Sequence, residues 1–164
     1  MSRFRVKIMI IVFSTAVALC TKKLYLPPGQ RVNYAFYKGV LERLRKWIQR
    51  VRRDFEDDWV LQHDNATAHT ALSIREFLVK INIPVLPRPP YSPDLAPCDF
   101  YLFPKLKSKL KGHHFRTMEN IQKNVTDELN TLTENDFRYC YDQWKMHWNH
   151  CVTSQRSYIE GDNL

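Results

Sequence analysis

The chain of 164 residues has the length of one domain, and with 44% hydrophobic and 13% aromatic residues it can build a core, which excludes disorder for most of its length. The four cysteines are sparse and show no C-x-x-C spacing, which excludes a disulfide framework and a zinc ribbon. The net charge of +8 is uneven: residues 1–53 hold thirteen Lys and Arg against Glu42 alone, and residues 54–164 hold twelve against sixteen acids. The basic half favours a polyanionic partner, although a solvated charged face explains it equally well.

The first 29 residues allow two interpretations. Basic residues before the apolar run 8–20 are typical of a secretory signal, and the run is too short to span a membrane. Residues 9–13 are also rich in Ile and Val, as in a strand, and residues 24–26 suggest a second strand before a Pro-Pro-Gly turn at 27–29. We favour the hairpin, and periodicity alone does not exclude the signal.

The next segments alternate between helix and strand. Apolar residues at helical spacing predict an amphipathic helix over residues 37–51 with a basic outer face. Residues 59–63 have the pattern of a short strand that ends at Asp64 and Asn65. A helix over about 68–80 and a strand over 83–86 follow. This order predicts an α/β domain.

Five of the nine prolines lie in residues 87–97 and predict a stiff loop. A helix follows, with Asp99 at its start and Gly112 as its stop, and a second covers 118–132. A third begins after Thr133, whose spacing to Asp136 predicts a capping box. The apolar residues that it is expected to bury are Phe137, Cys140, Tyr141, Trp144, Trp148 and Cys151. We expect one domain over residues 1–152 and a loose tail over 153–164.

Two aspartates lie where an α/β domain places its chemistry, Asp64 at a strand end and Asp99 at a helix start. Carboxylates are preferred ligands of hard divalent cations, and two metal ions can activate an attacking hydroxyl and stabilise a leaving oxygen in phosphodiester chemistry. An aspartate in a loop is by itself more often a turn former or a helix cap. The surrounding residues therefore decide the interpretation.

These surroundings read HDNAxxH over residues 63–69 and YSPDLAPCDF over residues 91–100, with thirty-four residues between Asp64 and Asp99. LPPGQ at 26–30 and LFPKLK at 102–107 flank them. The pattern resembles the catalytic domain of mariner-type (Tc1/mariner) transposases from about residue 7 to the C-terminus. It is close to the mariner lineage that is also found fused to a SET-domain histone methyltransferase.

The resemblance implies an RNase H-like (retroviral-integrase-like) fold, a mixed sheet flanked by helices, that binds Mg²⁺ or Mn²⁺ and cleaves and joins DNA strands. Asp64 would be the second and Asp99 the third catalytic, metal-binding aspartate, with Asn65 and His69 as supporting residues. Asp94 competes with Asp99 for its role, and the spacing favours Asp99. The implied partners are DNA and a second copy of the chain, in the nucleus, with neither a membrane nor a small-molecule substrate.

The sequence departs from the family pattern near its N-terminus. We do not find the strand with the family's first aspartate, and Glu42 lies on the polar face of a basic helix. Helix-turn-helix modules that bind transposon ends are also not found. We therefore expect a truncated domain that lacks the first strand and has an incomplete metal site. Little strand-transfer activity is expected of it alone.

Two sets of basic residues are candidates for contacts with DNA phosphates, with a solvated helix face as the alternative. They are Arg43, Lys46, Arg50 and Arg53 in the first helix and Lys105, Lys107, Lys109 and Lys111 before Gly112. Two function classes remain open, a nuclease or transposase core and a non-catalytic basic DNA-binding module or remnant. A secreted protein is disfavoured because the resemblance extends across residues 7–20.

Overall fold

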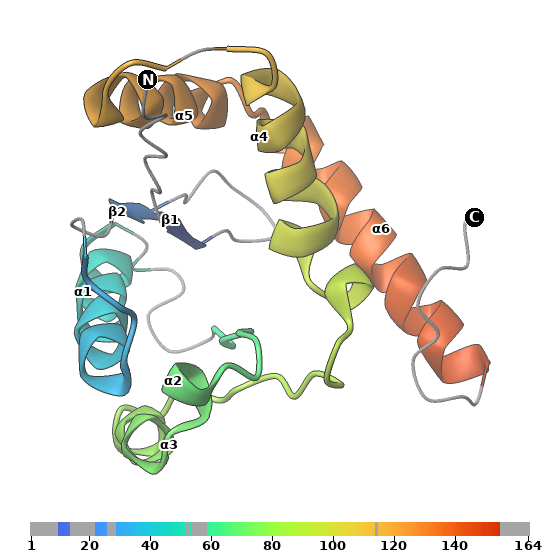
Figure 1. Cartoon of the computed structure of the whole chain (residues 1–164). Coiled ribbons are helices and arrows are strands. Elements are labelled where there is room, and N and C mark those ends of the chain that lie inside the picture. Colours follow the sequence, from blue (N-terminus) through green and yellow to red (C-terminus); the bar gives the residue numbers. More distant parts are fainter. Residues whose placement is uncertain are drawn as a thin grey trace. The chain divides into compact units, whose positions relative to one another are not determined.

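The computed structural model describes residues 10–13, 22–25, 29–51, 53, 59–113 and 115–154. The chain forms two compact units (Figure 1). The middle unit is Gln30–Tyr91, and the terminal unit combines Met1–Gly29 with Ser92–Leu164. Within the described ranges, no helix is both long and apolar enough to cross a membrane.

The expected N-terminal hairpin is present. Strand β1 (Ile10–Phe13) pairs antiparallel with β2 (Lys22–Tyr25), with Ile10 opposite Tyr25 and Phe13 opposite Lys22. The intervening residues 14–21 and the expected turn at 27–28 lie outside the described residues. The hairpin interpretation of the Ile- and Val-rich segment is confirmed.

Helix α1 (Tyr34–Val51) organises the middle unit. The Asn33 side chain accepts a hydrogen bond from the backbone N–H of Phe36 and so caps the first turn. The predicted apolar stripe is confirmed at its centre, because Tyr37, Val40, Leu41, Leu44 and Ile48 are buried. Val51 at the C-terminal end is exposed. Helices α2 (Thr67–Thr70) and α3 (Leu72–Lys80) pack against α1.

The prediction of one helix over residues 68–80 is wrong at Ala71, which is extended (φ −53°, ψ 142°) and separates α2 from α3. At about 100° per residue, a continuous helix would place His69 about 140° away from Ile74 around its axis. The break allows Ile74 to be buried while His69 contacts Asp64. With the break at Ala71, His69 of α2 and Ile74 of α3 both face the interior of the middle unit.

The predicted strands at 59–63 and 83–86 are reduced to one parallel bridge between Leu61 and Val85. Leu61 donates to the carbonyl of Pro84 and accepts from the N–H of Leu86, both at 2.9 Å. Extending the parallel ladder toward Trp59 would need an N–H from Pro84, and proline has none, so the ladder cannot continue in that direction. The mixed sheet that was expected is therefore represented, in the described residues, by the hairpin and this bridge.

The described part of the terminal unit is mostly helical. After the 3₁₀ turn η2 (Pro93–Leu95) come the π-helical turn η3 (Cys98–Leu102), α4 (Phe103–Leu110), α5 (Met118–Asn130) and α6 (Glu134–Thr153). Gly112 has φ +87° and ends the α4 segment as predicted. The buried side chains that form one apolar cluster are Leu102, Leu106, Val125, Leu129, Leu132 and Phe137.

The predicted buried face of α6 is confirmed only near its start. Phe137 and Cys140 are buried, whereas Tyr141 is exposed and Trp144 is half-buried. Trp148 and Cys151 are half-buried as well. The apolar cluster reaches α6 only as far as its first turns, and Trp144 instead donates its indole N–H to the carbonyl of Leu95. Residues 155–164 of the expected tail lie outside the described residues.

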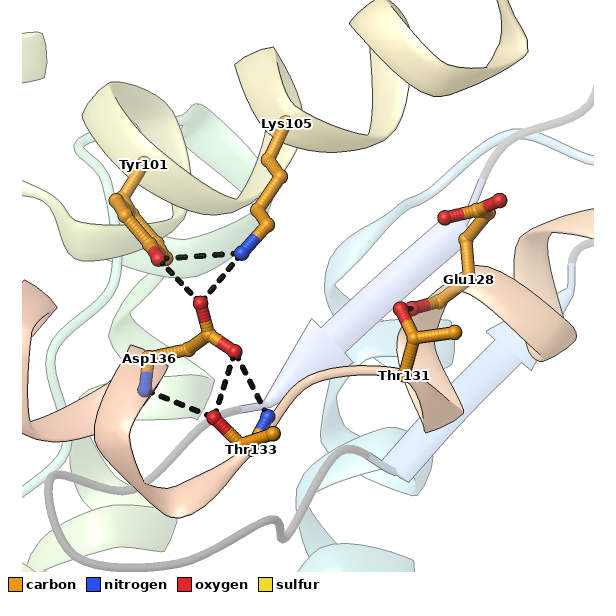
Figure 2. A network of polar contacts seen from close by, with 6 residues as sticks. All are labelled: Tyr101, Lys105, Glu128, Thr131, Thr133 and Asp136. Atoms are coloured by element: carbon orange, nitrogen blue, oxygen red, sulfur yellow. Dashed lines mark hydrogen bonds and ion pairs between the residues drawn. The ribbon is translucent and has the colours of Figure 1, made fainter.

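Asp136 joins α4 to the start of α6 (Figure 2). Its Oδ1 accepts hydrogen bonds from the Tyr101 hydroxyl at 2.9 Å and from the Lys105 ammonium. Its Oδ2 accepts from the backbone N–H and the hydroxyl of Thr133, at 2.8 and 2.9 Å. The Thr133 hydroxyl in turn accepts from the N–H of Asp136, which completes the predicted capping box. These hydrogen bonds hold the pKa of Asp136 far below its usual range, and the bond from Lys105 is the largest cause.

Replacing Asp136 should therefore destabilise the protein measurably. Asp136→Ala removes the cap and the bonds to Tyr101 in η3 and Lys105 in α4, and we expect a loss of about 1–3 kcal/mol in the free energy of unfolding. Asp142→Ala is the matched control, since Asp142 forms an exposed pair with Lys145 on the same helix and should change stability by less than about 0.5 kcal/mol. Urea unfolding followed by tryptophan fluorescence measures both. Equal midpoints for the two variants would contradict this role.

The same network predicts a loss of stability in acid. Because the native pKa of Asp136 lies below the unfolded value of about 3.9, the unfolded chain binds the additional proton first as the pH falls. The contribution of Asp136 is thus complete above about pH 5, begins to fall near the unfolded pKa of about 4 and is lost progressively as the pH falls further toward the native pKa. Melting temperatures between pH 6 and pH 3 should fall more steeply for the wild type than for Asp136→Asn. Parallel curves would show that Asp136 is not linked to folding.

Candidate functional site

Asp64 follows the parallel bridge by three residues. Leu61, which forms the bridge with Val85, is buried at 4% exposure and anchors the segment, whereas half of the Asp64 side chain (51%) is exposed. The following residue, Asn65, donates its side-chain amide to the carbonyl of Arg88 at 3.2 Å and ties this segment to the proline-rich loop. Asp64 is therefore an exposed carboxylate on a backbone that is fixed on both sides.

One oxygen of Asp64 is fixed by two donors. Its Oδ1 accepts from Nδ1 of His69 at 2.5 Å and from the backbone N–H of Ala66 at 3.0 Å. Among the described residues, its Oδ2 accepts no hydrogen bond. The His69 hydrogen bond is the main cause that lowers the pKa of Asp64 to about 2, against the opposing effect of partial burial. Asp64 is therefore ionised at neutral pH.

The ring of His69 belongs to a cluster of three aromatic rings, with those of Tyr37 and His63. The ring of His69 lies 3.9 Å from that of Tyr37 between centroids, and it stacks on His63 at 5.4 Å with an interplanar angle of 8°. Burial raises the pKa of Tyr37, whose hydroxyl therefore stays protonated, and burial lowers the pKa of His63 to about 4. Tyr37 consequently donates to Nδ1 of a neutral His63, at 2.9 Å.

Sequence reasoning included Tyr37 in the apolar stripe of α1 and gave His63 no role. One signal was available for Tyr37, because a buried tyrosine hydroxyl needs a polar partner. Helical periodicity does not show which partner that is, since His63 lies 26 residues further along the chain. The contacts of Tyr37 and His63 with His69 are thus found from the structure and not from the sequence.

Asp99 lies in the terminal unit, in the first turn of η3. Its side chain is exposed, and its backbone N–H donates to the carbonyl of Ala96 at 2.9 Å. Its competitor Asp94 lies in η2, where its carbonyl accepts from Nδ1 of His147 at 2.7 Å. Asp64 and Asp99 belong to different units. Across the described part of the chain, no three His, Cys, Asp or Glu side chains form a metal-binding group.

The predicted basic residues differ in what they contact. On the middle unit, Arg43, Lys46, Arg50 and Arg53 are exposed, and the guanidinium of Arg43 lies over the ring of Phe36. On the terminal unit, the residues of the predicted set that are exposed are Lys107, Lys109 and Lys111. Lys105 is paired with Asp136, so its charge is already compensated within the protein.

Comparison with known proteins extends over most of the chain. Residues 25–122 match the family model of the DDE superfamily endonucleases. The chain is 35% identical to the Mariner Mos1 transposase of Drosophila mauritiana over 82% of its own length and 40% of the relative. It is 26% identical to the histone-lysine N-methyltransferase SETMAR of Homo sapiens over 94% of its length and 23% of the relative. The chain thus spans less than half of these relatives.

Solved structures agree with these matches. The Mos1 transposase catalytic domain with Raltegravir and Mn superimposes with a TM-score of 0.84 at 30% identity, over 93% of this chain and 78% of that one. The Mos1 mariner paired-end complex with Mn gives a TM-score of 0.87 at 31% identity, over 97% and 47%. These likenesses support the expected RNase H-like fold class. The chain belongs to the DDE superfamily of endonucleases and corresponds to the catalytic domain of mariner transposases.

Proposed function

We propose that this domain cleaves and joins DNA strands with the help of Mg²⁺ or Mn²⁺, and that Asp64 and Asp99 are its metal-binding catalytic residues. The observation that carries the proposal is that the family match over residues 25–122 contains both aspartates. Structures of the Mos1 catalytic domain with Mn and with Mg support the choice of cation. Mos1 complexes that contain transposon ends support DNA as the substrate.

The carboxylate of Asp64 is chemically suited to bind a divalent cation. Asp64 is ionised and exposed, and the two donors on Oδ1 leave Oδ2 as the oxygen available to a ligand. Mg²⁺ is commonly held by one or two carboxylates together with water and substrate phosphate. A bound cation would supply Lewis-acid stabilisation of the phosphodiester and activate the attacking hydroxyl. In this proposal His69 orients Asp64, and Asn65 fixes the backbone beside it.

The proposed DNA contacts of the middle unit are Arg43, Lys46 and Arg50 of α1 with Arg53 after its end. A second set is Lys107, Lys109 and Lys111. We leave Lys105 out because it pairs with Asp136. The Mos1 paired-end complexes favour a second copy of the chain as a partner, and DNA as substrate favours the nucleus. With two of the three expected carboxylates identified, the 164-residue polypeptide by itself should have little strand-transfer activity.

Mn²⁺ binding and plasmid nicking test the two aspartates. Electron paramagnetic resonance of free Mn²⁺ measures affinity, and relaxation of supercoiled plasmid in Mn²⁺ measures cleavage. We expect Asp64→Ala and Asp99→Ala each to weaken Mn²⁺ binding by at least about tenfold and to abolish any nicking, since each removes a ligand charge. Asp94→Ala is the matched control and should leave both unchanged.

Two results would contradict the proposal. Wild-type Mn²⁺ affinity in Asp64→Ala would exclude Asp64 as a ligand, and loss of binding in Asp94→Ala rather than Asp99→Ala would reassign the second position. Efficient integration of a marked DNA end by the 164-residue polypeptide would contradict the expected low activity. DNA binding without Mn²⁺ binding would favour the non-catalytic DNA-binding module.

The basic face of α1 gives a separate prediction. Replacing Arg43, Lys46 and Arg50 by Gln should lower DNA affinity and reduce the slope of log affinity against log salt by about 0.9 for each phosphate that the variant no longer neutralises. Fluorescence anisotropy of a labelled duplex between about 50 and 200 mM salt measures both quantities. Lys38→Gln, on the same helix, is the control. An unchanged slope in the triple variant would show that α1 presents only a solvated face.

A further inference from the structure

The orientation of the Asp64 carboxylate depends on its hydrogen bonds. Half of its side chain is exposed, so solvent alone would leave its carboxylate free to rotate. The bonds from His69 and Ala66 both reach the same oxygen, Oδ1. The Ala66 bond is made by backbone, whereas the His69 bond holds only as long as the imidazole keeps its position. What fixes that ring therefore decides how well Asp64 is oriented.

Tyr37 packs against the ring of His69 and, among the described residues, makes no hydrogen bond to Asp64. The two rings are 3.9 Å apart between centroids, and the tyrosine is 2% exposed in the buried stripe of α1. The hydroxyl of Tyr37 is bonded to His63, whose ring stacks on the same His69. The ring of His69 thus contacts those of Tyr37 and His63, and these two side chains are joined by a hydrogen bond.

We propose that Tyr37 is a positioning residue of the metal site, which holds His69 directly and through His63 so that Asp64 presents Oδ2 to a divalent cation. This inference rests on the proposed function, because it assumes that Asp64 binds the cation. The elements involved all belong to the middle unit. The clamp, defined as Tyr37, His63 and His69, needs no residue of the terminal unit to act.

A purely structural role for Tyr37 is the alternative, since any buried tyrosine in a helix contributes to the core. The two roles differ in what a double substitution does. If Tyr37 acts through Asp64, its replacement weakens Mn²⁺ binding only while Asp64 is present. If it only stabilises the fold, its effect on binding does not depend on Asp64.

The experiment measures Mn²⁺ affinity by electron paramagnetic resonance, with the thermal unfolding midpoint recorded for every variant. Tyr37→Met removes the ring, and we expect it to weaken binding by about tenfold, the usual size for loss of a group that orients a ligand. Tyr37→Phe keeps the ring and should weaken binding measurably but less than Tyr37→Met, because only the bond to His63 is lost. Tyr34→Met, an exposed tyrosine on the same helix, should leave binding unchanged.

Two further comparisons sharpen the result. His69→Gln, which keeps an N–H donor, should restore part of the affinity that His69→Ala loses. In the Asp64→Ala background, Tyr37→Met should change the remaining Mn²⁺ affinity by less than about twofold. Wild-type affinity in Tyr37→Met or Tyr37→Phe, or the same fold loss with and without Asp64, overturns the clamp. Wild-type affinity in Asp64→Ala overturns the proposed function instead.

Discussion

The hydrogen bond from His69 to Asp64 is the contact on which the candidate site of the middle unit depends. It requires the chain to turn back within five residues of Asp64, and α2 provides that turn by starting directly after Ala66. An unbroken helix would place His69 about 140° away from Ile74 around its axis. The extended residue Ala71 separates α2 from α3, and His69 contacts Asp64 while Ile74 is buried. The break in the helix therefore allows one imidazole to lie beside one carboxylate without loss of the buried face of α3.

Asp64 and Asp136 show why a low pKa does not by itself identify a functional carboxylate. Both pKa values lie well below the usual range, and hydrogen bonds are the main cause in each case. Asp136 uses both oxygens for contacts within the protein, with partners in α4 and η3 and at the start of α6. Asp64 uses one oxygen and is more exposed. The same electrostatic state therefore stabilises a helix junction in one place and leaves a potential ligand in the other.

Local signals made part of the fold and of the site predictable. Helical spacing identified α1, α5 and α6. Motif spacing selected Asp64, Asp99 and His69 as candidate site residues, and the structure places His69 in contact with Asp64. The sheet was overestimated on its N-terminal side because Pro84 cannot extend the parallel ladder toward Trp59. The buried face of α6 was overestimated because periodicity does not show how far another element covers it. The role of Tyr37 depends on contacts with rings 26 and 32 positions away, which no local pattern encodes.

Helix α1 combines two requirements on opposite faces. Its buried face contains Tyr37 and reaches the ring cluster, whereas its exposed face contains Lys46 and Arg50. A long helix fixes both faces relative to each other, so a phosphate held on one side and a carboxylate oriented on the other would keep a constant geometry within the middle unit. Loss of charge on the exposed face should leave the buried rings unchanged, since those side chains point into water. The proposed DNA contacts and the proposed orientation of Asp64 therefore use different faces of one helix and can be tested separately.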